Sequence, residues 1–97
     1  MSIQLDKEFN IVADRAIESW GEEAQMDMMI EECAELIVEL IKRKRNSNGS
    51  TTRSIITEFV DVELMLGQMK RLFDDFDDIW KEEREYKLNR LKERLGI

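Results

Sequence analysis

Residues 22–45 read EEAQMDMMIEECAELIVELIKRKR, and this stretch decides the fold. Its Glu, Leu, Met and Lys residues are good helix formers, and it contains neither Pro nor Gly. The apolar residues recur three and four positions apart, which is the period of an α-helix. They are Met26, Met29, Ile30, Cys33, Ala34, Ile37, Val38 and Ile41. The stretch therefore predicts one long amphipathic helix.

The sequence before this stretch, and the sequence directly after it, predict a helix and a loop. Apolar residues at helical spacing predict a first helix over 4–20, closed by Gly21. The segment NSNGS at 46–50 collects turn-forming residues and predicts a loop, after which Thr51 or Thr52 can cap the next helix. The basic run KRKR that ends the long stretch suits a helix C-terminus.

Two further helices complete the chain. Apolar residues at helical spacing predict a third helix over 55–73. The acidic run DDFDD at 74–78 follows this helix and suits the N-terminus of a fourth helix over 79–95. Gly96 is predicted to end the fourth helix. We therefore predict an all-α protein whose residues 1–97 form a single domain, a four-helix bundle.

Composition limits the partners and the compartment. The formal net charge of −7 repels a nucleic-acid polymer, but a free nucleotide that arrives with divalent cations is not excluded. Cys33 is the only cysteine, so an internal disulfide cannot form, and a reducing compartment is the simplest context. Because no apolar run resembles a signal peptide or a membrane span, we expect a cytoplasmic protein with no membrane partner.

Two pairs of acidic residues share one spacing. Glu32 and Glu35 lie three residues apart on the long helix, and Glu58 and Asp61 lie three apart on the third helix. Residues at this spacing occupy one face of a helix, so each pair can point toward a common centre. Hard cations such as magnesium prefer oxygen ligands, and two facing pairs could hold one or two ions together with substrate phosphates.

The ordinary explanation of such acids is a solvated helix face. On the long helix the apolar arc centres near Ile30 and Ile37, and Glu32, Glu35 and Glu39 lie roughly opposite it. Taken alone, this arrangement favours a solvated acidic face over a metal site.

The third helix gives the opposite result. Glu58 lies at heptad spacing from Met65 and four residues before Val62, inside the stripe that should face the core, and Asp61 borders this stripe. A carboxylate buried without a partner is costly, so these acids should meet a cation, a metal ion or another polar group. We favour a metal ion.

The chain contains no histidine, which narrows the choice of metal. Di-iron sites in helical bundles pair Glu with His, and zinc sites normally use His or Cys. A site made of carboxylates alone therefore suits magnesium, with manganese as a substitute. Cys33 has no histidine to activate it and lies on the apolar side of its helix, so core packing is predicted for it in place of nucleophilic catalysis.

The segments EECAEL at 31–36 and EFVDVEL at 58–64 resemble the MazG-like nucleotide pyrophosphohydrolases, whose pattern is EExxE followed by ExxD. The resemblance covers about residues 20–72. It implies hydrolysis of a nucleoside triphosphate between its α and β phosphates, which gives a monophosphate and pyrophosphate. It also implies that Glu32, Glu35, Glu58 and Asp61 bind magnesium, and that Glu31 lies beside them and orients or activates water.

The resemblance further implies nucleotide contacts and self-association. Lys87, Asn89 and Arg90 stand where the family has a basic residue and an Asn that touch phosphates or sugar, although the spacing here departs from the commoner pattern. These basic residues could instead be solvated or pair with nearby glutamates. Trp20 could stack on a base, but core packing is the commoner role of such a residue. Family members are usually dimers or larger, so a homodimer or higher homo-oligomer is expected.

Two other functions remain open at this point. One is a catalytically silent helical bundle that binds a protein partner through a Met-rich face. The other is a sensor that binds a magnesium–nucleotide complex without turnover. Preference for a base or a sugar follows no motif in the sequence.

Overall fold

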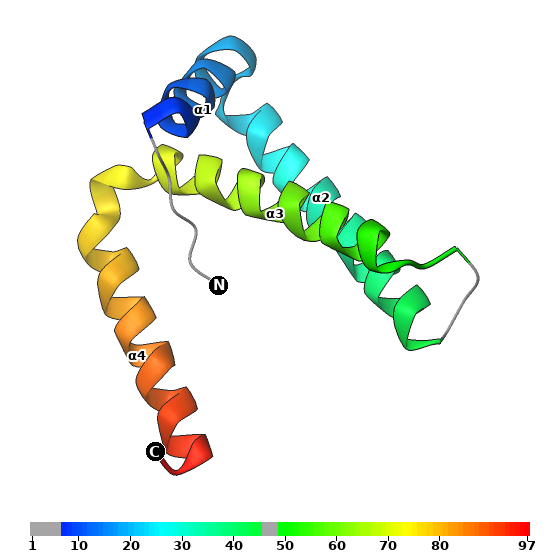
Figure 1. Cartoon of the computed structure of the whole chain (residues 1–97). Helices are drawn as coiled ribbons and strands as arrows, with labels where there is room; N and C mark the ends of the chain where they lie inside the picture. Colours follow the sequence, from blue (N-terminus) through cyan, green and yellow to red (C-terminus); the bar gives the residue numbers. More distant parts are fainter. Residues whose placement is uncertain (1–6, 46–48) are drawn as a thin grey trace.

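The computed structural model describes residues 7–45 and 49–97, and the regular structure in these ranges is helical throughout. The helices are α1 (Lys7–Trp20), α2 (Glu22–Lys44), α3 (Thr52–Leu72) and α4 (Asp77–Leu95), with a short 3-10 turn η1 (Asp74–Phe76) before α4 (Figure 1). The predicted all-α class and the four predicted helices are confirmed. Residues 4–6 of the predicted first helix, and 46–48 of the predicted loop, lie outside the described residues.

The helix ends follow local signals in the sequence. Thr51 is the N-cap of α3, where the Ser54 backbone N–H donates to Thr51 Oγ1 at 3.0 Å and the Thr51 N–H donates to Ser54 Oγ at 2.8 Å. Gly21 separates α1 from α2 with a φ of 91°, a conformation that residues with a Cβ rarely adopt. Gly96 ends α4 in the left-handed region. The predicted caps and terminators are therefore confirmed.

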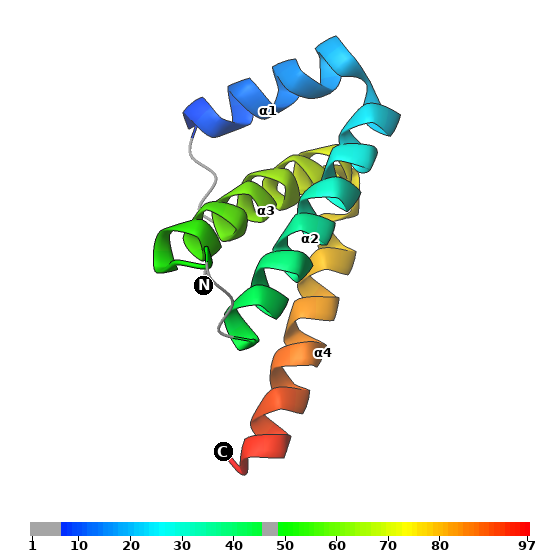
Figure 2. The ribbon, with the colours of Figure 1, turned by 90° about the vertical axis from the view of Figure 1, so that its right-hand side faces the viewer.

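The body of the protein consists of α1, α2 and α3. α2 and α3 lie side by side in antiparallel directions, and α1 packs across the end where α2 begins and α3 ends (Figures 1 and 2). Ala13 of α1 is 1% exposed at this crossing. Arg71 of α3 donates to both carboxylate oxygens of Asp14, at 2.9 and 2.7 Å, and so ties α1 to the end of α3.

α4 does not complete a compact bundle. It leaves the body at η1 and projects away from the other helices (Figures 1 and 2). The Cα radius of gyration is 15.9 Å, above the ~13 Å expected of a compact domain of this size. Leu88, Leu91 and Leu95 recur at helical spacing on α4 but are each more than half exposed, so this side of α4 does not pack against the body. The predicted four-helix bundle is thus formed by three helices only, and no described helix is long and apolar enough to span a membrane.

The inner side of the α2–α3 pair includes buried polar residues, and much of the apolar surface of the pair lies on its outer sides. On α2, Gln25 and Glu39 are only 2% and 9% exposed, whereas Ile30 and Ile37 are 67% and 58% exposed. The interpretation of the acidic face of α2 as a solvated face is therefore wrong, because that face packs against α3. Helical periodicity shows which residues share a face, but it does not show which face meets the neighbouring helix.

α3 repeats this arrangement. Its outer side carries the exposed residues Ile56, Val60 and Leu64, four positions apart, while Met65 on the inner side is buried. We call the following exposed apolar residues the outer apolar faces: Ile30, Ile37, Val38 and Ile41 on α2, and Ile56, Val60 and Leu64 on α3.

Candidate metal centre

Four carboxylates meet in the middle of the α2–α3 pair. Glu32 and Glu35 come from α2, and Glu58 and Asp61 come from α3. Each offers one oxygen atom, and these four oxygens all lie within 4.8 Å of one another. The i, i+3 spacing aligns each pair on one helix face, and the antiparallel packing brings the two faces together. We call this group the carboxylate cluster.

The carboxylate cluster lacks a cationic partner among the described residues. Glu32, Glu58 and Asp61 are partly buried, and Glu35 is exposed. Glu32 Oε2 and Glu58 Oε2 are shielded from solvent and accept no hydrogen bond from any described residue. Among residues 7–45 and 49–97, the ion pairs are those of Arg71 with Asp14 and with Asp74. Hard carboxylate oxygens left without donors fit a magnesium ion, which prefers such ligands.

The crowding of negative charge changes the acidity of two members of the cluster. Burial, followed by the charges of Glu35 and Asp61, raises the pKa of Glu32 above its ordinary value, and a hydrogen bond with Asp61 acts in the same direction. Burial, followed by the same two charges, raises the pKa of Glu58. Both shifts favour a proton or a metal ion at the cluster over four bare charges.

These shifts predict how stability depends on pH. The folded-state pKa values of Glu32 and Glu58 lie above the ordinary 4.5, so the folded protein binds protons more tightly than the unfolded chain does. The stabilisation from protonation is complete below pH 4.5 and is lost as the pH rises through the raised pKa values. In chelator we expect the melting temperature, followed by circular dichroism, to fall over this window.

Magnesium provides the control for this prediction. It competes with protons for the same oxygens, so at saturating magnesium the melting temperature should fall less, or not at all, as the pH rises. Asp14 affects the pH dependence of stability in the opposite sense. Its hydrogen bond with Arg71 lowers its pKa below 3.8, so the stabilisation that it gives is lost only as the pH falls below that range. A melting temperature that rises from pH 4.5 upward in chelator would contradict the shifts.

Sequence reasoning placed Glu39 on a solvated face of α2, but the structure buries it beside the cluster. The Ser54 hydroxyl donates to Glu39 Oε1 at 2.5 Å and joins the start of α3 to the last turns of α2. The charge of Glu39 also contributes to the raised pKa of Glu58. A signal was available, because Glu39 lies one heptad after Glu32 and Ser54 lies four residues before Glu58. Glu39 and Ser54 thus extend the polar inner side of the pair beyond the cluster.

The other predicted site residues lie outside the carboxylate cluster. Glu31 is exposed on α2, next to Glu32 in the chain. Lys87, Asn89 and Arg90 are exposed on α4, which projects from the body. Lys87 Nζ and Arg90 Cζ lie 5.9 and 5.8 Å from the centre of the Tyr86 ring. The structure therefore does not bring these α4 residues together with the cluster.

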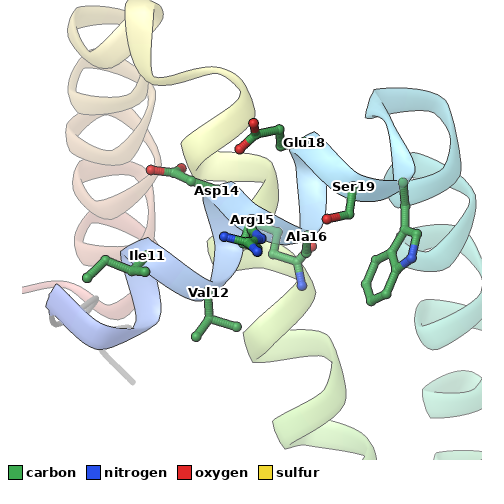
Figure 3. Close-up of a pocket in the computed structure, with 9 residues that line it drawn as sticks. Ile11, Val12, Asp14, Arg15, Ala16, Glu18 and Ser19 are labelled. Carbon is green, nitrogen blue, oxygen red and sulfur yellow. The ribbon is translucent and has the colours of Figure 1, made fainter.

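Trp20 is not a core residue in this structure. Its side chain is 70% exposed, so the prediction of core packing is wrong for the single chain. Trp20 ends α1 directly before the turn at Gly21, where few neighbours can cover it. It lines a groove of about 630 Å³ together with Ser19 and Gln68, and most of the groove wall comes from α1 (Figure 3). Cys33, the other predicted core residue, is partly buried.

Comparisons with known proteins do not assign a function to this site. The MazG-like resemblance therefore stays a prediction that rests on the two acidic motifs and on the way α2 and α3 bring them together. No protein-family model, curated protein or solved structure matches the chain.

Proposed function

We propose that the chain is a MazG-like, magnesium-dependent pyrophosphohydrolase that converts a ribo- or deoxyribonucleoside triphosphate to a monophosphate and pyrophosphate. The carboxylate cluster is the observation that carries the proposal. Four oxygens from two helices lie within 4.8 Å of one another, and no described Lys or Arg forms an ion pair with them. The order of the motifs, EExxE before ExxD, gives this cluster the form that the MazG-like resemblance implies.

In this proposal some residues bind the metal ion and another activates the attacking water. Glu32, Glu35, Glu58 and Asp61 hold magnesium, which neutralises phosphate oxygens and makes water more acidic when it is bound. Glu31, exposed beside Glu32, orients the attacking water and accepts its proton. A new bond forms between the water oxygen and the α-phosphorus as the α–β anhydride bond breaks, and pyrophosphate leaves. No covalent enzyme intermediate is needed.

The proposed nucleoside contacts come from residues outside the carboxylate cluster. Trp20 offers an exposed, flat apolar ring on which a base can stack. Lys87, Asn89 and Arg90 project with α4, so they reach a bound nucleotide only if α4 lies against a second copy or folds over the body. Their proposed role in binding phosphates and sugar therefore depends on self-association.

We propose that the protein is at least a homodimer, and the outer apolar faces support this. Ile30 and Ile37 of α2 are more than half exposed in the single chain, and Ile56 and Val60 of α3 are 53% and 43% exposed. An apolar surface that runs along two helices is more than a monomer usually leaves in water. A second copy would cover it with an equally apolar face, as a two-fold interface requires.

The function is tested by supplying the purified protein with ribo- and deoxyribonucleoside triphosphates, with magnesium or with chelator. Products are resolved by ion-exchange chromatography. We expect a monophosphate and pyrophosphate with magnesium, and no turnover in chelator. A diphosphate and inorganic phosphate would place the cleavage at another bond and reject the proposal. Nucleotide binding without any product would favour a sensor, and neither binding nor product would favour a partner-binding bundle.

A further inference from the structure

The junction where α1 crosses the α2–α3 pair has an unusual centre. Its most buried side chains are Ala13 and Gln25, at 1% and 2% exposed, and no large side chain is fully buried in the described part of the chain. Three amide groups at the junction have a buried atom with no hydrogen-bond partner among the described residues. These atoms are Asn10 Oδ1 on α1, Gln25 Nε2 on α2 and Gln68 Oε1 on α3.

Leaving these buried amides without hydrogen bonds costs free energy. A buried N–H or C=O group gives up its hydrogen bonds to water and recovers that free energy only when it meets a new partner. An apolar residue in place of Gln25 would avoid this cost entirely. The presence of three unpaired amide atoms in one junction therefore points to a polar guest that supplies donors and acceptors together.

The register of the helices places two of these amides in line with the carboxylate cluster. Gln25 lies seven residues before Glu32 on α2, and Gln68 lies seven residues after Asp61 on α3. Glu32 and Asp61 meet across the pair in the carboxylate cluster. Because a heptad returns to nearly the same helix face, Gln25 and Gln68 also lie at one level of the pair, about 10 Å from Glu32 and Asp61 along the helix axes.

We propose that Gln25 and Gln68 form a nucleobase subsite, in which the Gln25 amide nitrogen donates to the base edge and the Gln68 amide oxygen accepts from it. This inference rests on the proposed function, because it takes the phosphates to lie at the carboxylate cluster. The separation of about 10 Å suits one nucleotide that spans the two sites. Gln68 also lines the groove that contains Trp20, so a base in that groove can stack on the indole ring and meet Gln68 at its edge. Gln25 does not line this groove, and its buried amide nitrogen meets the base only when the junction opens.

Paired substitutions test the subsite. Gln25→Leu and Gln68→Leu remove the amides and keep a similar side-chain volume, and Met65→Leu, on the inner side of α3, is the matched apolar control. We measure the melting temperature in chelator, its shift with each of the four common ribonucleoside monophosphates, and kcat/KM for the four triphosphates with magnesium. The monophosphate shifts need neither metal nor turnover, so they report on the subsite independently of catalysis.

The Gln→Leu substitutions are expected to stabilise the free protein and to weaken its binding of nucleotides. Each Gln→Leu variant should melt higher than wild type without ligand, since an unpaired buried amide is lost. The melting shift given by the best monophosphate should shrink, and the kcat/KM ratio between best and worst base should fall on the order of tenfold. Met65→Leu should keep the wild-type base preference.

The two proposals can fail separately. An unchanged base preference in both Gln→Leu variants, or no melting shift of the wild type with any monophosphate, would overturn the subsite. If monophosphates shift the wild type in an amide-dependent way and no triphosphate is hydrolysed, the subsite stands and the proposed catalytic function fails.

Discussion

Replacing Glu58 by Gln is expected to abolish magnesium-dependent hydrolysis and to stabilise the metal-free protein in the same variant. Glu58 holds a partly buried carboxylate whose Oε2 accepts no hydrogen bond from any described residue, and burial and neighbouring acids raise its pKa. A neutral amide of the same shape removes a metal ligand and also removes part of the charge repulsion. The turnover number should fall at least on the order of a hundredfold.

The two effects require three measurements. Chromatographic product analysis gives the turnover number, titration calorimetry gives magnesium affinity, and thermal unfolding in chelator at neutral pH gives the stability of the metal-free protein. Glu63→Gln is the matched control, because Glu63 lies on the same helix but outside the carboxylate cluster. A Glu58→Gln variant that keeps wild-type turnover would reject the proposed metal site. A lower melting temperature in chelator would show that Glu58 has a structural partner instead.

Replacing Ile37 by Glu is expected to convert the proposed homodimer into a monomer. Ile37 is 58% exposed near the middle of the outer apolar face of α2. In a two-fold interface the substitution introduces two carboxylates, which lose water and repel each other. We expect the dissociation constant to rise by a factor on the order of a hundred or more, as for a residue at the centre of an interface.

Sedimentation equilibrium over a range of concentrations measures this change. Ile97→Glu is the matched control, because Ile97 is also an exposed isoleucine, 81% exposed, but lies after α4 and away from the outer apolar faces. The control should associate as the wild type does. A wild type that is monomeric at every concentration, or an Ile37→Glu variant that associates normally, would show that these faces do not join two copies.

Local signals in the sequence were enough to predict the helices and their ends. Gly21, Thr51 and Gly96 act through the conformation or hydrogen bonds of their own neighbourhood, so each is readable without knowledge of the fold. The side of α2 that packs against the rest of the chain could not be predicted in this way. The prediction assumed that its apolar arc faces the core of its own chain, and this fails when the apolar arc is turned outward.

The candidate site shows the same difference between local signals, which could be predicted, and tertiary contacts, which could not. The carboxylate cluster was predictable because the i, i+3 spacing aligns each pair before any tertiary contact forms. The burial of Glu39 was not predicted, because its hydrogen-bond partner Ser54 comes from another helix. The exposure of Trp20 and the projection of α4 also depend on which helices pack together. These contacts are tertiary, and one helix taken alone carries no signal for them.

The antiparallel register of α2 and α3 also determines where the chain tolerates a change in length. One residue inserted between Glu32 and Glu39 would rotate the following part of α2 by about 100° and separate Glu39 from Ser54. Residues added to the connection between α2 and α3 would leave both helices in register, because loop closure depends only weakly on loop length. Natural insertions, and engineered tags or reporter domains, should therefore be accommodated in that connection and excluded from the helical segments on either side.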